Sequence, residues 1–235
     1  MLTNDHGKRL IKELEAARNG RMLQDVFTDF VRMSALAIES PLTRGEQHRD
    51  IEDEFAHIRA GYNDEQYEHI RTALAIVVDA LEERRVEFLG TVLEEIGASN
   101  VRNGQFFTPP AVGRAMAELT GADLGYTPGK PITVADIAGG SGVLLIEQAE
   151  ALLKRGIPMG DILVLHGDID ARSCDIAYVQ FTMLGYPAIV CHQDGLTGEF
   201  YREPMYTLGY YRHCFPMRGI DPMREVKNEE TRSNR

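Results

Sequence analysis

The feature that most constrains the fold is a short apolar stretch that ends in a glycine-rich turn. Residues Ile132–Ala135 are apolar or β-branched, and they are followed by the run Asp136-Ile137-Ala138-Gly139-Gly140-Ser141-Gly142. A stretch of this kind bounded by glycines is typical of a buried strand, and the residues after Gly142 have the apolar spacing of a helix. A glycine turn between a strand and a helix lets a ligand approach the backbone and points N–H groups at it. The segment therefore predicts a binding turn at the end of a strand.

The region from residue 104 to about 196 repeats this alternation of helix and strand, which is typical of a parallel sheet in an α/β domain. The strands are expected at Ile132–Ile137, Ile162–Gly167 and Ala188–Cys191, with room for one more at Met205–Tyr211. The connecting helices are expected at Ala111–Leu119, Gly142–Lys154 and Arg172–Leu184.

Residues 1–103 are predicted to form a helical region in front of the α/β domain. Apolar residues recur there at helical spacing, and Gly20, Ser40-Pro41 and Gly61 interrupt the pattern. The expected helices are 8–19, 23–38, 45–60 and a last one that begins at a cap on Asn63 or Asp64 and continues to Gly97. The α/β domain then covers residues 104–220, and residues 221–235 form a polar tail.

The amino-acid composition bears on the cell compartment and on which partners the protein can bind. The three cysteines form no CxxC pair and the seven histidines are scattered, so we expect a reduced, cytoplasmic protein without a metal site. No apolar run approaches the roughly 20 residues that span a membrane, and no secretory signal pattern is present, so no membrane partner is expected. The 36 acidic and 25 basic residues give a net charge of −11, which argues against tight DNA binding by this chain alone.

A second motif, Gln105-Phe106-Phe107-Thr108-Pro109, precedes the glycine turn by about thirty residues and enters a helix at a Pro-Pro step. The two motifs together resemble the S-adenosyl-L-methionine (SAM) site of N6-adenine DNA methyltransferases, particularly the modification subunits of type I restriction systems. The resemblance covers residues 20–200, most clearly 87–196. It implies a Rossmann-like SAM-dependent methyltransferase fold, with a truncated parallel sheet, behind an α-helical N-terminal region.

The resemblance also implies roles for individual residues at the methionine end of the cofactor. The segment Phe106, Phe107, Thr108 and Pro109 would fold over the methionine, and Asp136 would bind its ammonium group. The N–H groups of the turn would meet the methionine carboxylate; the residues of the turn are Ala138, Gly139, Gly140, Ser141 and Gly142. The family usually has cysteine at the position of Gly139, and we expect the smaller residue to open the turn.

Acidic residues follow the next two predicted strands. An acid about one strand–helix–strand step beyond a glycine turn accepts hydrogen bonds from ribose hydroxyls, and Asp168 has this position, with Asp170 as the alternative. Asp194 follows the third strand within Gln193-Asp194-Gly195-Leu196, which resembles the family's Gly-Asp-Ser-Leu, where the acid lies beside the adenine amino group. Each of these features also has a structural interpretation, as a tight turn, a loop entering a helix, or a helix cap.

The catalytic motif of the family, Asp/Asn-Pro-Pro-Tyr/Phe, is absent from the chain. The nearest substitute is Glu203-Pro204-Met205-Tyr206, so Glu203, Pro204 and Tyr206 are the candidate catalytic residues. This run comes soon after Asp194 without an intervening strand, and the sheet is predicted to stop after its SAM-binding half. The first strand would then lie at an edge of the sheet, and we expect the segment around Tyr206–Tyr210, or another subunit, to cover it.

Three functions are therefore open. The first is a SAM-dependent N6-adenine DNA methyltransferase, or its cofactor-binding subunit in a restriction-modification system, with DNA as the substrate either directly or through a partner subunit. The second is a catalytically inactive SAM-binding relative that acts as a regulatory or binding module. The third, methylation of a protein amide or small molecule, has the least support because it also needs the missing motif. An oligomer formed through the sheet edge fits either of the first two.

Overall fold

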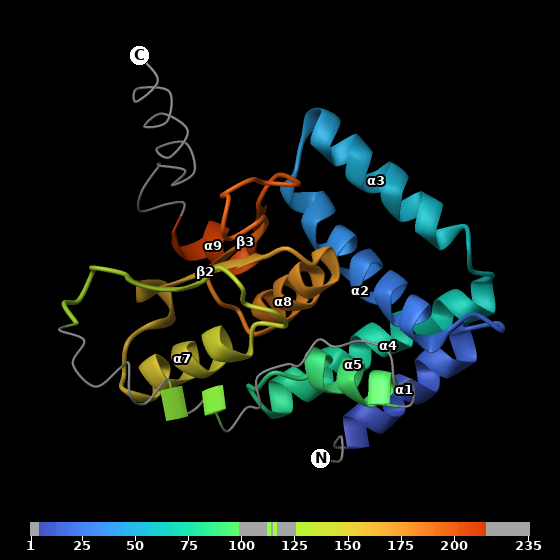
Figure 1. Ribbon diagram of the computed structural model, residues 1–235, viewed down its shortest axis with the longest axis horizontal. Helices are drawn as coiled ribbons and strands as arrows, with labels where there is room; N and C mark the ends of the chain where they lie inside the picture. Colours follow the sequence, from blue (N-terminus) through green and yellow to red (C-terminus); the bar gives the residue numbers. More distant parts are fainter. Residues whose placement is uncertain (1–4, 99–111, 114, 117–125, 215–235) are drawn as a thin grey trace.

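The computed structural model describes residues 5–98, 112–113, 115–116 and 126–214, and it joins a helical N-terminal half to a small α/β half (Figure 1). The motif at residues 105–109 and most of the helix expected at 111–119 lie outside the described residues. The helices of the N-terminal half are α1 (Asp5–Ala17), α2 (Leu23–Glu39), the short 3-10 helix η1 (Ser40–Leu42), α3 (Gly45–Arg59), α4 (Asp64–Glu83) and α5 (Leu89–Ala98).

Local chemistry explains where α4 begins and ends. Asn63 caps the helix: its side chain accepts a hydrogen bond from the Gln66 N–H, and the Gln66 side chain accepts one from the Asn63 N–H. The helix does not continue to Gly97 as the sequence pattern predicts. It ends at Glu83, because Arg84 is extended and the buried side chain of Glu87 accepts hydrogen bonds from the Gly90 and Thr91 N–H groups at the start of α5.

The α/β half contains a four-stranded sheet in the order β1-β2-β3-β4. Its strands are β1 (Ile132–Asp136), β2 (Ile162–Asp168), β3 (Ala188–His192) and β4 (Met205–Tyr206). The helices between and after them are α7 (Val143–Lys154), the 3-10 helix η2 (Met159–Asp161), α8 (Ala171–Met183) and α9 (Leu208–His213). The first three strands are parallel, in the register Val134 to Val164 to Ala188, and their predicted positions are confirmed to within two residues.

The last strand differs from the prediction in length and in position. β4 is antiparallel to β3 and pairs Met205 with Val190, so it lies at the edge opposite β1. Thr207 explains this placement, because its hydroxyl donates to the Tyr186 carbonyl, accepts from the Ala188 N–H and caps α9. The segment 206–210 therefore does not cover β1, and this alternative was wrong; cover by another subunit stays a prediction. Thr133 and Ala135 of β1 are exposed.

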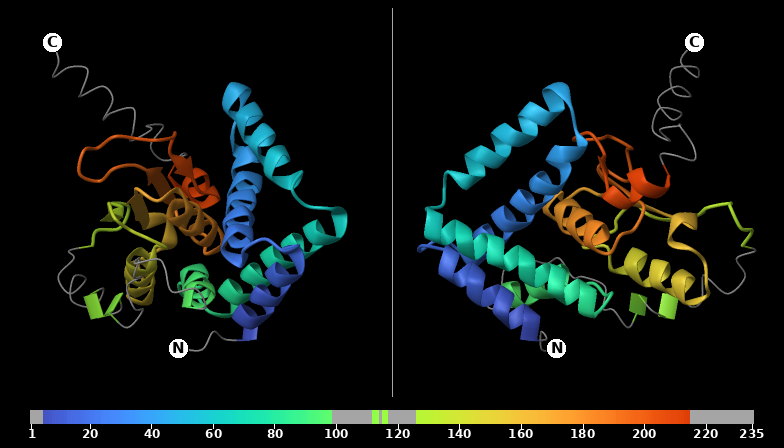
Figure 2. Two further views of the ribbon diagram at one scale, coloured as in Figure 1. Left: turned by 45° about the vertical axis from the view of Figure 1, so that its right-hand side comes forward. Right: turned by 180° about the vertical axis from the view of Figure 1, so that it is seen from behind.

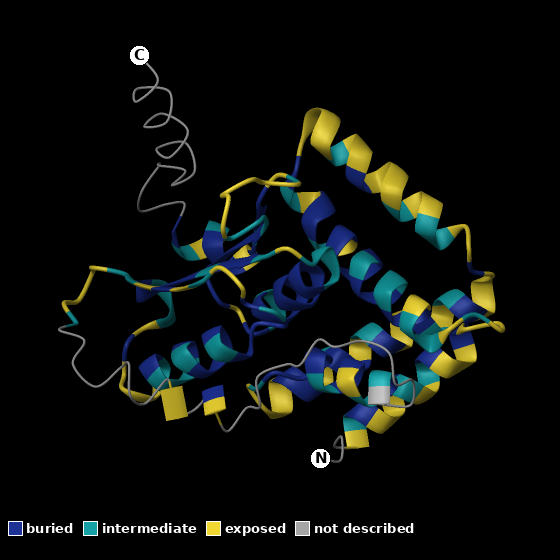
Figure 3. Cartoon of the chain, in the orientation of Figure 1, coloured by how far each residue is buried: buried dark blue, intermediate teal, exposed yellow. Residues whose placement is uncertain are grey.

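One hydrophobic core runs from the helical half into the α/β half. Phe27 and Phe30 of α2 and Tyr178 and Phe181 of α8 are all fully buried in it, and α8 lies beside α2 in both Figures 1 and 2. Within the described part of the chain, the opposite face of the sheet has a small cluster of its own, which α9 closes with Tyr210. Figure 3 shows α2 and α8 as largely buried and α3 as largely exposed. None of the described helices is long and apolar enough to cross a membrane.

Candidate cofactor site

Hydrogen bonds join the ends of the three parallel strands into one site. The Gly139 N–H donates to the Gly167 carbonyl (2.9 Å), which links the glycine turn after β1 to the end of β2. The Gly140 N–H donates to Asp168 Oδ2 (2.8 Å). The Gln193 N–H then donates to the Asp168 carbonyl (2.9 Å), which adds the loop after β3. The structure therefore brings together the glycine turn and the acid that the sequence places one unit later.

The backbone of the turn requires glycine at two positions. Gly140 (φ 54°) and Gly142 (φ 92°) are in the left-handed region that L side chains rarely adopt. Gly142 is also the N-cap of α7, and a Cβ there would be 2.7 Å from Cζ of Phe181. Because the first N–H groups of a helix have no partner within the helix, the first turn of α7 offers donors beside the turn.

His166 of β2 fills the space beside Gly139. A Cβ at position 139 would be 2.5 Å from His166 Cδ2, and Gly139 itself does not need a left-handed backbone. We expected the absence of a side chain at Gly139 to open the turn. It does not, because the imidazole of His166 occupies that space. The sequence carried a signal for this residue: His166 is a polar residue in an otherwise apolar strand, directly before Gly167.

The imidazole of His166 is held neutral. It is 2% exposed, and this burial lowers its pKa, although the hydrogen bond to Gly140 and the charges of Asp168 and Asp136 act in the opposite direction. The Nε2 atom is 2.9 Å from the Gly140 carbonyl, which can only accept, so Nε2 carries the proton. The Nδ1 atom has no hydrogen-bond partner among the described residues.

We expect His166 to make stability depend on pH near neutrality. Its pKa is lower in the folded than in the unfolded state, so below about pH 6.5 the unfolded chain takes up a proton that the folded chain does not. The free energy of unfolding should therefore fall with decreasing pH, by up to about 1.4 kcal/mol per pH unit from this group. Urea unfolding of the wild type and His166→Gln between pH 5 and 8 measures the effect. Parallel pH profiles of the two proteins would contradict it.

The two predicted acids that follow β2 have different surroundings. Asp168 accepts from Gly140 and, through Oδ1, from the Asp170 N–H (2.8 Å), and it retains lone pairs for a ligand. Asp170 is the N-cap of α8, where it accepts from the Arg172 N–H and the Ser173 hydroxyl. Asp170 therefore has a structural function, and Asp168 stays the predicted ligand of the ribose.

Asp194 lies on an exposed loop that reaches the end of β1. Hydrogen bonds from the Leu196 and Thr197 N–H groups lower the pKa of Asp194, so its carboxylate is ionised. The next residue, Gly195, packs against Ile137, and a Cβ on it would be 2.7 Å from the Ile137 carbonyl oxygen. Asp194 is therefore near the strand that ends in Asp136, whose carboxylate accepts a hydrogen bond from the Ala138 N–H.

Sequence reasoning missed the apolar side chains that accompany these acids. Ile137 follows Asp136, Ile169 follows Asp168, and Leu196 lies two residues after Asp194. They are 57%, 62% and 97% exposed, respectively. Apolar surface with a few polar groups among it is typical of a small-molecule site. The signal was available, since each isoleucine directly follows an acid at a predicted strand end.

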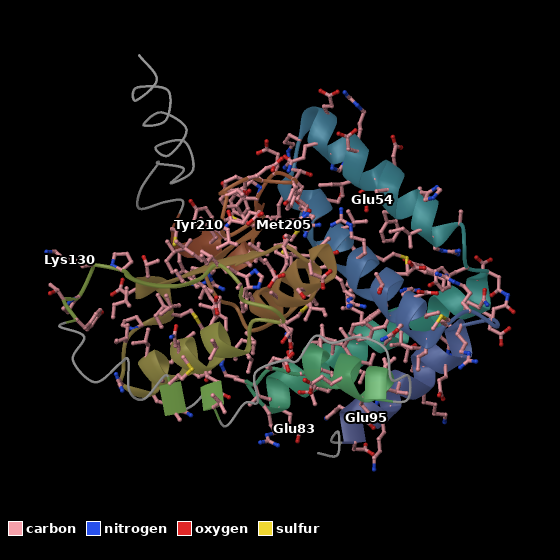
Figure 4. All side chains as sticks on the ribbon, in the orientation of Figure 1. Glu54, Glu83, Glu95, Lys130, Met205 and Tyr210 are labelled. Atoms are coloured by element: carbon pink, nitrogen blue, oxygen red, sulfur yellow. The ribbon has the colours of Figure 1, made fainter. Side chains whose placement is uncertain are left out.

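The candidate catalytic residues lie elsewhere. Pro204 is buried, and Tyr206 packs its ring against Tyr210 at a centroid distance of 5.0 Å. Since β4 is the fourth strand of the sheet, Tyr206 is three strand spacings, about 14 Å, from β1. Figure 4 labels Met205 and Tyr210 together beside β3, apart from Lys130 in the segment before β1. The structure does not bring this motif to the glycine turn; Glu203, on the loop before β4, is exposed.

Two further expectations concern the segment 106–109 and the metal-binding side chains. Phe106, Phe107, Thr108 and Pro109 lie outside the described residues, so their packing over a cofactor stays a prediction. Among the described residues, no group of three or more histidine, cysteine or acidic side chains is arranged to hold a metal ion.

The chain was compared with known families and proteins. Residues 89–185 match the family model described as N-6 DNA Methylase. The matched segment contains α5, β1, the glycine turn, β2 and α8, and it ends just before β3. No curated protein and no solved structure gives a significant match.

Proposed function

We infer the function from one premise: residues 89–185 of the chain match the N-6 DNA methylase family. We propose that it binds SAM at the carboxyl ends of β1, β2 and β3 and is the cofactor-binding subunit of an N6-adenine DNA methyltransferase. The observation that carries the proposal is the hydrogen-bonded junction of the glycine turn with Asp168. Bound SAM would supply an activated methyl group.

The residues present fit this cofactor. Its methionine carboxylate needs donors, which the first turn of α7 offers, and its ammonium needs an acid, which Asp136 supplies. Asp168 has free lone pairs for two ribose hydroxyls. Ile169 and Leu196 expose apolar surface beside Asp168 and Asp194, and an adenine ring can pack on such surface while its amino group donates to Asp194.

A partner subunit is part of the proposal. The candidate catalytic run 203–206 leads into β4, and β1 is the other edge strand of the sheet that the described residues form. The net charge of −11 also disfavours DNA binding by this chain alone. We propose that a second chain pairs with β1, brings the residues that hold the target adenine, and contacts the DNA. The assembly would act in the cytoplasm, in a restriction-modification system.

A second candidate function is a catalytically inactive SAM-binding relative that acts as a regulatory or binding module. The specific observation in its favour is that Tyr206 is committed to packing with Tyr210, so it is not free to stack on a flipped base. Both functions require SAM binding, and only the first requires methyl transfer in the presence of a partner.

SAM binding by Asp168→Ala tests the proposed site. We expect a loss of affinity of about tenfold to a hundredfold, because hydrogen bonds to a charged group contribute about 1.5–3 kcal/mol. The measurement is isothermal titration of SAM into the wild type, into Asp168→Ala, and into Asp53→Ala as a control. Asp53 is an exposed acid on α3, so the control removes the same charge away from the site.

The same samples are then given unmethylated duplex DNA and labelled SAM. N6-methyladenine in the product would show that the isolated chain is an enzyme. SAM binding without transfer would support a subunit that needs its partner, or the inactive relative. Failure of the wild type to bind SAM would overturn the proposal.

A further inference from the structure

The N-terminus of α5 lies directly against the glycine turn, although it belongs to the helical half. Gly90 makes this approach possible: a Cβ there would be 2.5 Å from Ser141 Oγ and 2.6 Å from Ser141 Cβ. Ser141 is itself 1% exposed. The start of a helix therefore forms one wall of the turn that we assign to the cofactor, and no side chain at position 90 separates them.

Two buried side chains satisfy the N–H groups at the start of α5. Gln180 Oε1 accepts from the Phe88 N–H (2.7 Å) and the Leu89 N–H (3.0 Å). Glu87 accepts from the Gly90 and Thr91 N–H groups. These are the donors that a helix cannot satisfy internally, so α5 begins where it does because of Glu87 and Gln180.

Gln180 also holds the turn. Its Nε2 donates to the Ser141 carbonyl (3.0 Å) and to Glu87 Oε1 (3.3 Å). A glutamine side chain has two acceptor and two donor positions, and here each has a partner. Gln180 is 0% exposed and lies in α8. One side chain thus joins three elements: α5 through its oxygen, the turn through its nitrogen, and α8 through its backbone.

Only an amide can do this at position 180. A carboxylate would lose both donors and would face Glu87, where burial already raises the pKa of the carboxyl group. Methionine has nearly the shape of glutamine but would leave the Phe88 and Leu89 N–H groups and the Ser141 carbonyl without this partner in a site closed to water. The cost of losing Gln180 therefore falls on the turn and on α5 together.

We propose that Gln180 is a positioning residue for the cofactor turn, and that it couples the order of the turn to the order of the start of α5. The proposal deepens the proposed function and rests on it for the identity of the ligand. When SAM occupies the turn, its effect reaches α5 through the Ser141 carbonyl and the Gln180 amide. Cofactor binding at the turn would then change the order of the start of α5, which belongs to the helical half of the chain.

Hydrogen–deuterium exchange of Gln180→Met tests the coupling without any ligand. We expect exchange at least tenfold faster than wild type both at residues 88–91 and at residues 139–142, from the loss of about 1.4 kcal/mol or more of local stability. The control is Tyr178→Phe, which removes another buried hydrogen bond of α8, from the Tyr178 hydroxyl to the Tyr206 carbonyl (3.2 Å), away from the turn. In the control, residues 88–91 and 139–142 should exchange as in the wild type.

The result with SAM separates the coupling from the proposed function. In the wild type, SAM should slow exchange at residues 88–91 as well as at the turn, and in Gln180→Met the slowing at 88–91 should disappear. If the wild type binds no SAM, the proposed function fails while the ligand-free comparison still decides the role of Gln180. Faster exchange at only one of the two segments, or equal effects of Gln180→Met and Tyr178→Phe, would overturn the proposal. Should Gln180→Met not fold, Gln180→Glu takes its place. It keeps the acceptor for the Phe88 and Leu89 N–H groups but loses the hydrogen bond to the Ser141 carbonyl, so the coupling predicts faster exchange at residues 88–91 as well as at residues 139–142.

Discussion

Replacing Asp175 with alanine is expected to lower the free energy of unfolding by about 3–5 kcal/mol, because it removes the buried carboxylate shared by two partly buried arginines. Asp175 lies near the start of α8 with a side chain that is 4% exposed. It accepts from Arg32 of α2 (3.1 Å) and from Arg202 of the loop before β4 (2.8 Å). One carboxylate therefore holds α8, α2 and this loop together.

Arg32 has a second partner, which helps to keep it charged. Arg32 also makes a two-point contact with Glu54 of α3, with distances of 2.7 and 2.6 Å; Glu54 is labelled on α3 in Figure 4. Burial disfavours the charge of Arg32, but the hydrogen bonds with Glu54 and the attraction of Asp175 outweigh it and raise the pKa of the guanidinium. The arginine therefore stays charged when Asp175 is removed, and it cannot lower the cost by releasing a proton.

Urea unfolding measures this effect, with Glu68→Ala as the matched control. Glu68 pairs with Arg71 on the surface of α4 at 2.8 Å, with both side chains more than 60% exposed. Such pairs contribute less than about 1 kcal/mol, so the control should unfold almost as the wild type does. A loss in Asp175→Ala no greater than in Glu68→Ala would contradict the role assigned to the buried network.

Gly139→Ala is expected to weaken SAM binding by up to about a hundredfold and to lower stability by about 1–3 kcal/mol. The added Cβ would be 2.5 Å from Cδ2 of His166, so either the imidazole or the turn must move. Movement of the imidazole breaks its bond to the Gly140 carbonyl, and movement of the turn displaces Gly140 from Asp168. Either movement disturbs the contact between the glycine turn and Asp168, on which the proposed SAM binding depends.

A second substitution distinguishes this steric explanation from others. His166→Ala removes the ring that the new Cβ would meet, so the double variant Gly139→Ala/His166→Ala should recover part of the SAM affinity lost in Gly139→Ala. The coupling free energy from the four proteins measures the contact directly. Titration calorimetry gives the affinities, and additive losses would show that the two positions do not interact in this way.

The sequence predicted those parts of the molecule that depend on neighbouring residues along the chain. The strands ending in Asp136 and Asp168 were found because an apolar run and a glycine or an acid lie side by side in the sequence. The cap on Asn63 was found for the same reason. The resemblance to N6-adenine DNA methyltransferases was recognised from motifs of this local kind, and residues 89–185 match the model of the N-6 DNA methylase family.

The parts that were missed depend on residues distant in sequence. The break between α4 and α5 is stabilised by Gln180, more than ninety residues after Phe88. His166 fills the space at Gly139 from another strand, which no pattern around either residue reveals. The position of β4 follows from the bonds of Thr207 to residues of the segment that enters β3. Each is a tertiary contact that overrides a correct local pattern.

The core shared by α2 and α8 bears on how this chain can be inherited and exchanged. A gene fragment that encodes only residues 89–185 would carry the family motifs but would expose the face of α8 that packs on Phe27 and Phe30, together with the unpaired charge of Asp175. Recombination within that segment would therefore separate binding residues from the surface that supports them. The smallest unit that keeps this surface covered includes α2, so the helical half and the glycine turn are expected to stay together in any functional fragment.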